Sequence, residues 1–226
     1  MSSTNTSKNI VIVGANRGIG LEFARQLSAD KNNQVFALCR KASPQLKELP
    51  LRLIENCEVT DIHSLKATAQ QLPDSVDWLI HVAGILRRDS LKELNFPEIE
   101  EQLRVNSLGP LMTTSVLLPK LAEGSKIAFL SSRMGSVADN TSGAYYGYRS
   151  SKAALNMMGV SLAHDLKPQG ITVLLLHPGY VQTDMTDHHG DIDASTSAER
   201  MIQLIAEKGL ADSGRFFHSN GQELPW

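Results

Sequence analysis

Ile10-Val-Ile-Val-Gly14-Ala-Asn-Arg-Gly18-Ile-Gly20 is the stretch that decides the fold. Residues 10–13 are apolar and β-branched, which predicts a buried strand, and apolar residues spaced three and four apart predict a helix from Gly18 to Ala29. Glycines in such a turn let the backbone approach a pyrophosphate, which the unpaired N–H groups at the helix start would bind. The stretch therefore predicts a dinucleotide site, with an ordinary tight turn as the alternative.

The rest of the chain repeats this alternation of strand and helix. We expect further strands at 34–38, 51–54, 77–81, 126–130 and 171–176, with an edge strand at 214–217. Helices are expected over 61–72, from Pro97 to Leu121, from about Tyr146 to Leu166, and from a capping box at Thr196–Glu199 through Ile205. Strict alternation predicts one doubly wound α/β Rossmann domain over 1–226, a parallel sheet of about seven strands with helices on both faces.

Composition excludes several classes of protein. The chain has 226 residues, of which 42% are hydrophobic and 20% are charged, a composition typical of globular domains. Its net charge of −2 gives no basic surface for nucleic acid or membrane. Two cysteines, Cys39 and Cys57, are too few for a disulfide scaffold, so free thiols are expected. Residues 1–8 are polar, without a secretion signal, and no apolar run would span a bilayer. We expect a cytoplasmic protein whose first eight residues are flexible.

Tyr148-Arg-Ser-Ser-Lys152 carries the chemistry. A four-residue spacing places Tyr148 and Lys152 on one face of the expected helix. An ammonium held near a phenol favours the phenolate and lowers a pKa that is ordinarily about 10. The pair therefore predicts a proton donor and acceptor near neutral pH, as carbonyl–alcohol chemistry requires.

The residues after the second expected strand indicate whether NADP or NAD is bound. A carboxylate there would bond a ribose 2′-hydroxyl, whereas arginine would bind a 2′-phosphate. The chain has Arg40-Lys41 at this place, with no acidic residue beside them, and Arg17 inside the glycine turn. These cations favour NADP over NAD as the cofactor. The alternative is that Arg17 and Arg40 are solvated surface charges.

With these motifs in place, the chain resembles the short-chain dehydrogenase/reductase family over almost its whole length. Further family motifs follow in the expected order, at 105–110 (Val-Asn-Ser-Leu-Gly-Pro), 130–135 (Leu-Ser-Ser-Arg-Met-Gly) and 177–183 (His-Pro-Gly-Tyr-Val-Gln-Thr). Within the family, the segments 131–136 and 148–156 and the closing Leu-Pro-Trp are similar to the sniffer-like carbonyl reductases and the bacterial C-factor proteins. The resemblance implies hydride transfer between a nicotinamide and a carbonyl carbon.

The resemblance also implies a role for each site residue. Tyr148 would donate the proton, Lys152 would lower its pKa and bind the nicotinamide ribose, and Ser132, with Ser131 as the competing choice, would bond the substrate oxygen. Asn106, ahead of a proline that frees a helix carbonyl and kinks the helix, would hold a proton-relaying water, with a kink residue of no catalytic role as the alternative. The residues implied in cofactor binding are Gly14, Asn16, Arg17, Gly18, Ile19, Gly20, Arg40, Glu58, Val59, Ala83, Gly84, Tyr148, Lys152, Pro178, Gly179, Val181 and Thr183.

Two positions depart from the family pattern. His81-Val82 precedes Ala83-Gly84 where the family usually has two asparagines, so an amide that pins neighbouring strands is missing, and His81 could replace some of that bonding. Glu58 stands where an aspartate usually contacts the adenine, one methylene longer. Ala83 and Gly84 still allow close backbone approach, and Glu58 keeps the charge of the usual aspartate.

Three functions remain open from the sequence. The leading one is an NADP(H)-dependent oxidoreductase of a small carbonyl or alcohol substrate, expected to form a homodimer or homotetramer through the helices of Asn106 and Tyr148. The second is a C-factor-like signalling or regulatory protein that binds the nucleotide with little turnover, and the third is a non-catalytic interaction protein.

Residues 184–195 are expected to form a mobile substrate loop rather than a metal site, despite the adjacent His188 and His189. Candidate apolar lining residues are Met134, Tyr145, Tyr180 and Met185.

Overall fold

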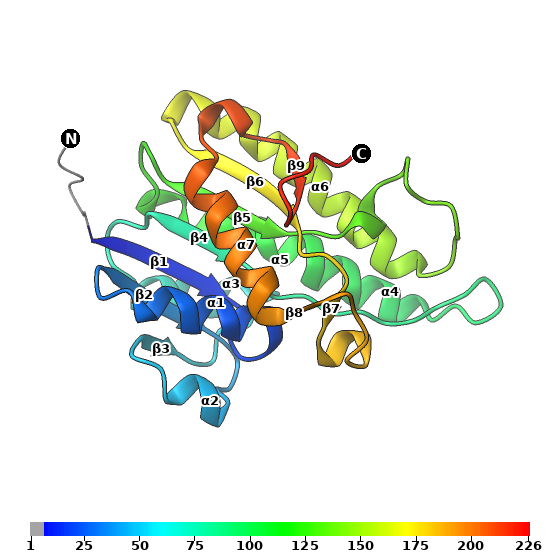
Figure 1. Ribbon diagram of the computed structural model, residues 1–226, viewed down its shortest axis with the longest axis horizontal. Helices are drawn as coiled ribbons and strands as arrows, with labels where there is room; N and C mark the ends of the chain where they lie inside the picture. The colour runs from blue at the N-terminus through cyan, green and yellow to red at the C-terminus, as the bar shows by residue number, and fades with distance from the viewer. Residues whose placement is uncertain (1–6) are drawn as a thin grey trace.

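The computed structural model describes residues 7–226 and forms one α/β domain (Figure 1). Seven parallel strands make its central sheet, in the order β3-β2-β1-β4-β5-β6-β9. Their bounds are β1 Lys8–Val13, β2 Asn33–Leu38, β3 Arg52–Ile54, β4 Trp78–His81, β5 Lys126–Leu130, β6 Thr172–His177 and β9 Phe216–His218. The predicted fold class, the parallel sheet and the edge strand are thereby confirmed.

Helices cover both faces of this sheet. One face packs against α1 (Gly18–Ala29), α2 (Pro44–Lys47) and α7 (Ala194–Glu207), and Figure 1 shows α1 and α7 side by side in front of the strands. The other face packs against α3 (Ile62–Ala69), α5 (Gly109–Leu117) and α6 (Tyr146–Leu166), with α4 (Phe96–Leu103) beside α6. Parallel strands need such crossover helices, and burial on both sides accounts for their continuous apolar runs.

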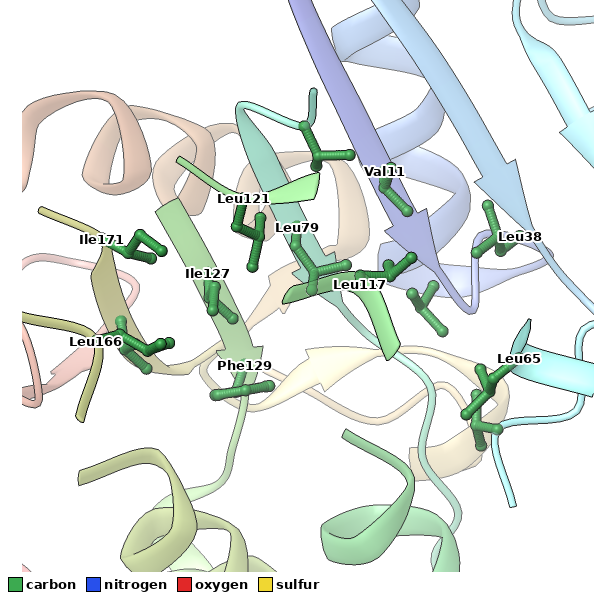
Figure 2. Close-up of a cluster of buried hydrophobic side chains, with 14 of the residues drawn as sticks. Val11, Leu38, Leu65, Leu79, Leu117, Leu121, Ile127, Phe129, Leu166 and Ile171 are labelled. Carbon is green, nitrogen blue, oxygen red and sulfur yellow. The ribbon is translucent and has the colours of Figure 1, made fainter. Parts of the chain in front are cut away.

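Each face of the sheet has its own core. Figure 2 shows the cluster under α3, α5 and α6, in which Leu79, Ile127 and Phe129 project from neighbouring strands toward Leu117 and Leu166. Alternate residues of the same strands fill the second core, because successive side chains of a strand point to opposite faces. The two cores hold the carboxyl ends of β1 and β4 in fixed positions.

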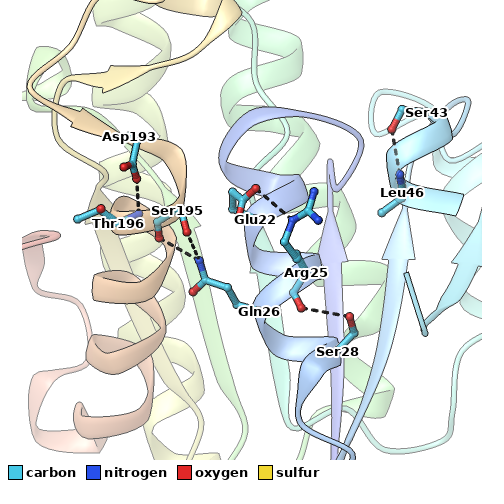
Figure 3. Close-up of polar contacts among 9 residues, drawn as sticks. All are labelled: Glu22, Arg25, Gln26, Ser28, Ser43, Leu46, Asp193, Ser195 and Thr196. Carbon is cyan, nitrogen blue, oxygen red and sulfur yellow. Dashed lines mark hydrogen bonds and ion pairs between the residues drawn. The ribbon is translucent and has the colours of Figure 1, made fainter. Parts of the chain in front are cut away.

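The last helix starts earlier than the sequence predicted. The capping box expected at Thr196 is wrong, because α7 begins at Ala194 and its N-cap is Asp193, whose carboxylate accepts from the backbone N–H of Thr196 at 2.6 Å (Figure 3). Gln26 of α1 donates to the backbone oxygen of Ser195, which ties the two helices together. The physical reason is that an aspartate accepts from the same donors as a threonine and stands three residues earlier.

The helix expected from Pro97 to Leu121 is divided. It runs as α4, then a π-helical turn η1 (Arg104–Leu108), then α5, and ends in a 3₁₀ turn at Leu118–Lys120. Pro110 has no N–H to donate, so the regular bonding cannot continue through it. The break falls at Asn106, where the sequence predicted a kink.

Some elements were not predicted. Helix α2, capped by Ser43, follows β2, and a two-stranded sheet pairs β7 (Val181–Gln182) with β8 (Ile192–Asp193). A 3₁₀ turn at Asp184–Thr186, β8 and the first two residues of α7 give regular structure to seven of the twelve residues of the expected loop 184–195. The flexible N-terminus expected over 1–8 lies mainly outside the described residues, and Lys8 belongs to β1. Within residues 7–226, no helix is long and apolar enough to cross a membrane.

Candidate active site

A cleft of about 780 Å³ opens at the carboxyl ends of β1 and β4. The strand order reverses between these two strands, and open α/β sheets bind ligands at such a switch point. Its size suits a dinucleotide. Predicted cofactor residues that line it are Gly14, Asn16, Arg17, Gly18, Ile19, Arg40, Glu58, Val59, Ala83, Gly84, Tyr148, Lys152, Pro178 and Thr183.

The glycine turn packs too closely for side chains. A Cβ on Gly14 would lie 2.6 Å from the backbone nitrogen of Ala83, and one on Gly20 would lie 2.1 Å from the backbone oxygen of Gly14. Gly14 also has a φ of +89°, which other residues rarely adopt. Gly20 does not line the cleft; it lets α1 start close to β1. The turn therefore leaves backbone at the cleft wall, next to the start of a helix.

One end of the cleft, called the adenine end because the sequence predicted the adenine ribose there, has two cations that already have partners. Arg40 lies 3.8 Å from the carboxylate of Glu58, and Arg17 lies 3.8 Å from that of Asp184. Glu58 also accepts from the backbone N–H and the hydroxyl of Thr60. Both arginines are largely exposed, so these ion pairs are weak and exchangeable. Two cations at this end can bind a phosphate by leaving their carboxylates.

The loop after β2 is fastened to the glycine turn. The side-chain oxygen of Asn16 accepts from the backbone N–H of Ser43 at 2.5 Å, and the Ser43 hydroxyl donates to the Asn16 backbone oxygen at 2.9 Å. Ser43 lines the cleft, as do Cys39 and Cys57, which are free thiols as predicted. None of these three residues was predicted to line the cleft. An Asn-to-loop contact across 27 residues leaves no local pattern in a sequence.

Tyr148 and Lys152 meet at the other end of the cleft. Both are buried, and the Lys152 Nζ lies 5.8 Å from the centre of the Tyr148 ring. That nitrogen donates to the backbone oxygen of Leu130 at 2.7 Å. Helix α6 supplies the four-residue spacing, and β5 supplies the carbonyl that fixes the ammonium. The predicted pair is therefore assembled at the cleft wall.

Burial shifts the proton equilibria of this pair. It raises the pKa of Tyr148 to about 12, and a hydrogen bond from Ser132 opposes the rise. It also lowers the pKa of Lys152 to about 8. The predicted lowering of the Tyr148 pKa by Lys152 is not found here, because loss of water disfavours both charged forms. The phenol is thus protonated at neutral pH and available as a donor.

The two candidate serines differ in their bonding. Ser131 lines the cleft, but its hydroxyl donates to the side-chain oxygen of Asn156 at 2.5 Å. The Ser132 hydroxyl accepts from the backbone N–H of Met134 at 3.2 Å and bonds toward Tyr148. Ser132 is the serine that affects the pKa of Tyr148, whereas Ser131 is the one that lines the cleft.

Asn106 lies fully buried in the π-helical turn η1. Its amide accepts from the backbone N–H of Ile85 at 2.8 Å and donates to the Ile85 oxygen at 2.8 Å and to the Ser151 hydroxyl at 2.9 Å. A Cβ on Gly84 would lie 3.2 Å from the Asn106 oxygen and 3.6 Å from the Lys152 Nζ. Asn106 thus joins η1, the cleft floor and α6, and stands close to Lys152.

His81 does not replace the bonding of the usual asparagine. It is buried at the end of β4, beside Phe129, and its Nε2 has no hydrogen-bond partner. Burial, with the nearby charge of Lys152, lowers the pKa of His81 to about 3. The imidazole is therefore neutral and holds no strand in place through this nitrogen.

The segment after β6 closes the cleft on one side. Pro178, whose backbone oxygen accepts from the hydroxyls of Ser197 and Ser219, lines the cleft with Thr183 and Met185. Gly179 and Val181 belong to this segment but do not line the cleft, so they are not placed at the cofactor. Of the other candidate apolar residues, Tyr145 lines a smaller hollow beside Asp89, and Met134 and Tyr180 line neither.

Several polar residues of 184–191 form ion pairs with one another or with Arg88. Asp187 pairs with Arg88, and His188 lies 3.3 Å from Asp184. Across the described part of the chain, no group of three His, Cys, Asp or Glu side chains is placed to hold a metal ion. The adjacent histidines therefore do not assemble a metal centre in this structure.

Comparison with known proteins gives the family. Residues 8–193 match the model of the short chain dehydrogenase family. A relative from Rhodococcus sp. (strain AD45), 1-hydroxy-2-glutathionyl-2-methyl-3-butene dehydrogenase, is 39% identical over 224 residues, which cover 96% of this chain and 99% of the relative. C-signal of Myxococcus xanthus is 43% identical over 154 residues, 67% of this chain and 93% of that protein.

Solved structures agree with the sequence relatives. The NADPH-bound carbonyl reductase from chicken fatty liver superimposes with a TM-score of 0.89 at 30% identity, covering 98% of this chain and 99% of that one. The carbonyl reductase Sniffer of D. melanogaster gives a TM-score of 0.89 at 28% identity, covering 98% and 100%. The predicted resemblance to sniffer-like reductases and C-factor proteins is confirmed.

Proposed function

This chain belongs to the short chain dehydrogenase family, and from that premise we propose that it is an NADP(H)-dependent oxidoreductase that interconverts a carbonyl compound and an alcohol. The observation that supports this most is the joint burial of Tyr148 and Lys152 at one end of the cleft formed by the glycine turn. A protein that only bound a nucleotide would need no buried proton donor there.

The residues of the cleft fit a nicotinamide dinucleotide. Gly14 leaves its backbone uncovered at the cleft wall, and a side chain there would collide with Ala83. The start of α1 provides N–H groups that can bind a pyrophosphate. When bound, the cofactor supplies the hydride. Lys152, anchored on the oxygen of Leu130, would hold the nicotinamide ribose.

Tyr148 and Ser132 would act on the substrate oxygen. The Tyr148 phenol is protonated at neutral pH, since burial raises its pKa to about 12, so it gives its proton to the oxygen of a carbonyl that is being reduced. Ser132 bonds the same oxygen and orients the phenol. Asn106, close to Lys152, would hold the water through which the proton is replaced.

We propose NADPH rather than NADH as the preferred cofactor. Arg17 and Arg40 lie at the adenine end, and exchange of their weak ion pairs for a 2′-phosphate gains two charge-assisted contacts. Two neighbours solved with the cofactor, the chicken reductase with NADPH and a Burkholderia cenocepacia dehydrogenase with NADP, support this choice.

A homodimer or homotetramer in the cytoplasm remains part of the proposal. Helices α4 and α6 pack together, and Met157 of α6 is an exposed apolar side chain on this side of the molecule. A symmetric interface there would bury such side chains. Sedimentation of the purified protein measures the assembly directly.

A second function draws on the similarity to C-signal. A signalling protein would bind the nucleotide without significant turnover. The experiment that separates the two functions measures NADPH and NADH binding by fluorescence, then NADPH oxidation with a panel of ketones, aldehydes and quinones. Binding with turnover supports the oxidoreductase, binding without turnover on every carbonyl favours the signalling protein, and no binding contradicts both.

A further inference from the structure

Asp89 bridges the cleft wall and the start of helix α6. It lies in the segment between β4 and α4, four residues after Ile85. Its two carboxylate oxygens accept one hydrogen bond each, from the backbone N–H of Tyr146 at 2.5 Å and of Gly147 at 3.0 Å. Its backbone oxygen accepts from Tyr145 at 3.0 Å. One residue thus binds three consecutive N–H groups of a distant segment.

The start of α6 needs this support. Ala144 and Tyr145 have φ values of 53° and 52°, a left-handed conformation that costs free energy for residues other than glycine. The N-cap residue Tyr145 contributes no side-chain hydrogen bond to the helix. Arg149 steadies the turn by donating to the backbone oxygens of Gly143 and Ala144. Asp89 binds the N–H groups of residues 145–147, three of the donors that a helix start leaves unpaired.

Asp89 is anchored in turn. Asn106 binds both backbone groups of Ile85, and the side-chain oxygen of Gln102 accepts from the backbone N–H of Arg87 at 2.8 Å. The segment 85–89 is therefore held along α4 and η1, and through Asp89 it holds α6. A charged acceptor at a helix start makes stronger bonds than a neutral one.

From this geometry we propose that Asp89 is a positioning residue for Tyr148, which follows directly after the two residues that its carboxylate binds. The inference rests on the proposed function for its kinetic consequence. Loss of the carboxylate frees the first turn and lets the phenol move. Lys152, one turn further along α6 and bound to Leu130, keeps its place.

The test compares Asp89→Ala with Asp89→Asn and with Asp61→Ala. Asp61 is a matched control, because its carboxylate caps α3 by accepting from His63 at 2.8 Å, and α3 has no site residue. In Asp89→Ala we expect kcat to fall about tenfold to a hundredfold, the cost of a misplacement near 1 Å. NADPH affinity and KM should stay near their wild-type values, and Asp89→Asn, which keeps one acceptor, should recover part of kcat.

Asp61→Ala should lower the melting temperature and leave kcat as in the wild type. An unchanged kcat in Asp89→Ala alongside a lowered melting temperature would show a purely structural cap and overturn the proposal. A parallel loss of NADPH affinity would also overturn it, because the whole helix would then have moved.

A readout without substrate separates this inference from the proposed function. The chain has four tyrosines, so 3-fluorotyrosine labelling gives four fluorine resonances, and Tyr148→Phe assigns the one of interest. We expect the Tyr148 resonance to shift or broaden in Asp89→Ala and to stay in Asp61→Ala. Should the wild type reduce no carbonyl, the proposed function fails, and an unmoved Tyr148 resonance would still overturn the role of Asp89.

Discussion

The two ends of the cleft handle charge in opposite ways. At the adenine end, the side chains of Arg17 and Arg40 are 71% and 78% exposed and pair loosely with carboxylates. At the reaction end, Tyr148 and Lys152 are 7% and 4% exposed, and burial displaces the pKa of both. One end keeps its charges in water; the other has removed them from it.

This contrast indicates which end of the cleft lowers the free energy of unfolding. Exposed ion pairs are worth little and are easily exchanged for a ligand phosphate. A buried amine without a fixed counter-charge works against folding and persists only because the surrounding structure holds it. We therefore expect removal of the Lys152 amine to affect turnover and folding in opposite directions, and removal of either exposed arginine to affect nucleotide affinity alone.

Lys152→Met should give the largest effect. Turnover should fall about 10³-fold, as loss of a proton-transfer partner does, whereas the free energy of unfolding at pH 7 should rise by about 1–3 kcal/mol. The native pKa of Lys152 is about 8 and the unfolded one is higher, so the unfolded state binds more protons above pH 8. Wild-type stability should then climb as pH rises from 8, and the advantage of the variant should shrink.

Lys126→Met is the control for that variant. Burial also lowers the pKa of Lys126, but its Nζ binds the backbone oxygen of Ile205 at the far end of the sheet. Kinetics and urea denaturation at pH 7 and pH 10 measure both variants. A destabilised Lys152→Met would contradict the contrast between the two ends.

Gly14→Ala should distort the glycine turn at the cleft wall. A Cβ there meets Ala83 at 2.6 Å, at a φ of +89°, so we expect NADPH affinity to fall about a hundredfold, or 2.7 kcal/mol. Gly124→Ala is a matched control, with a φ of +90° and nothing within 4 Å of the added Cβ. Fluorescence titration should show normal affinity in Gly124→Ala; an equal loss in both variants would mean that backbone strain, and not the contact, is responsible.

Sequence periodicity predicted the ends of some helices to the residue. It failed where two residues could each cap the start of a helix. The bounds of α1 and of α6 were predicted correctly, because each lies between clear punctuation and has a regular apolar stripe. The start of α7 was missed because Asp193 and Thr196 are both good caps. Helix α2 spans four residues, too few for a periodic signal.

Motif spacing predicted that four residues lie near one another, and the structure brings together Ser132, Tyr148, Lys152 and Asn106. The motifs did not predict that Gly20, Gly179 and Val181 lie away from the cleft, nor the energetics of the site. Burial has no local pattern, so the raised pKa of Tyr148 could not be foreseen. Long-range contacts such as that of Asp89 with α6 leave no motif either.

Arg17→Ala and Arg40→Ala test whether the two exposed arginines of the cleft bind NADPH. Each variant should weaken NADPH binding about tenfold, the worth of one charge-assisted contact, and leave NADH binding nearly unchanged. Arg25→Ala, which removes an exposed arginine paired with Glu22 on α1, should change neither. If all three variants behave alike, the two cleft arginines are ordinary surface charges.

His81→Leu should have the smallest effect at pH 7, a change in unfolding free energy within about 1 kcal/mol, because an unpartnered buried nitrogen is exchanged for apolar packing. The native pKa of His81 is about 3, below its unfolded value, so wild-type stability is lost as pH falls below 6.5. At pH 5 the variant should gain about 2 kcal/mol relative to the wild type. Equal pH dependence of the two proteins in urea denaturation would count against a buried neutral imidazole.

The most direct measurement is Tyr148→Phe, assayed for NADPH binding and for NADPH oxidation with a carbonyl that the wild type reduces. We expect nucleotide affinity to stay within about twofold, because no contact of the adenine end changes, and turnover to fall by at least about 10³-fold. Turnover that survives this substitution would contradict the assignment of Tyr148 as the proton donor.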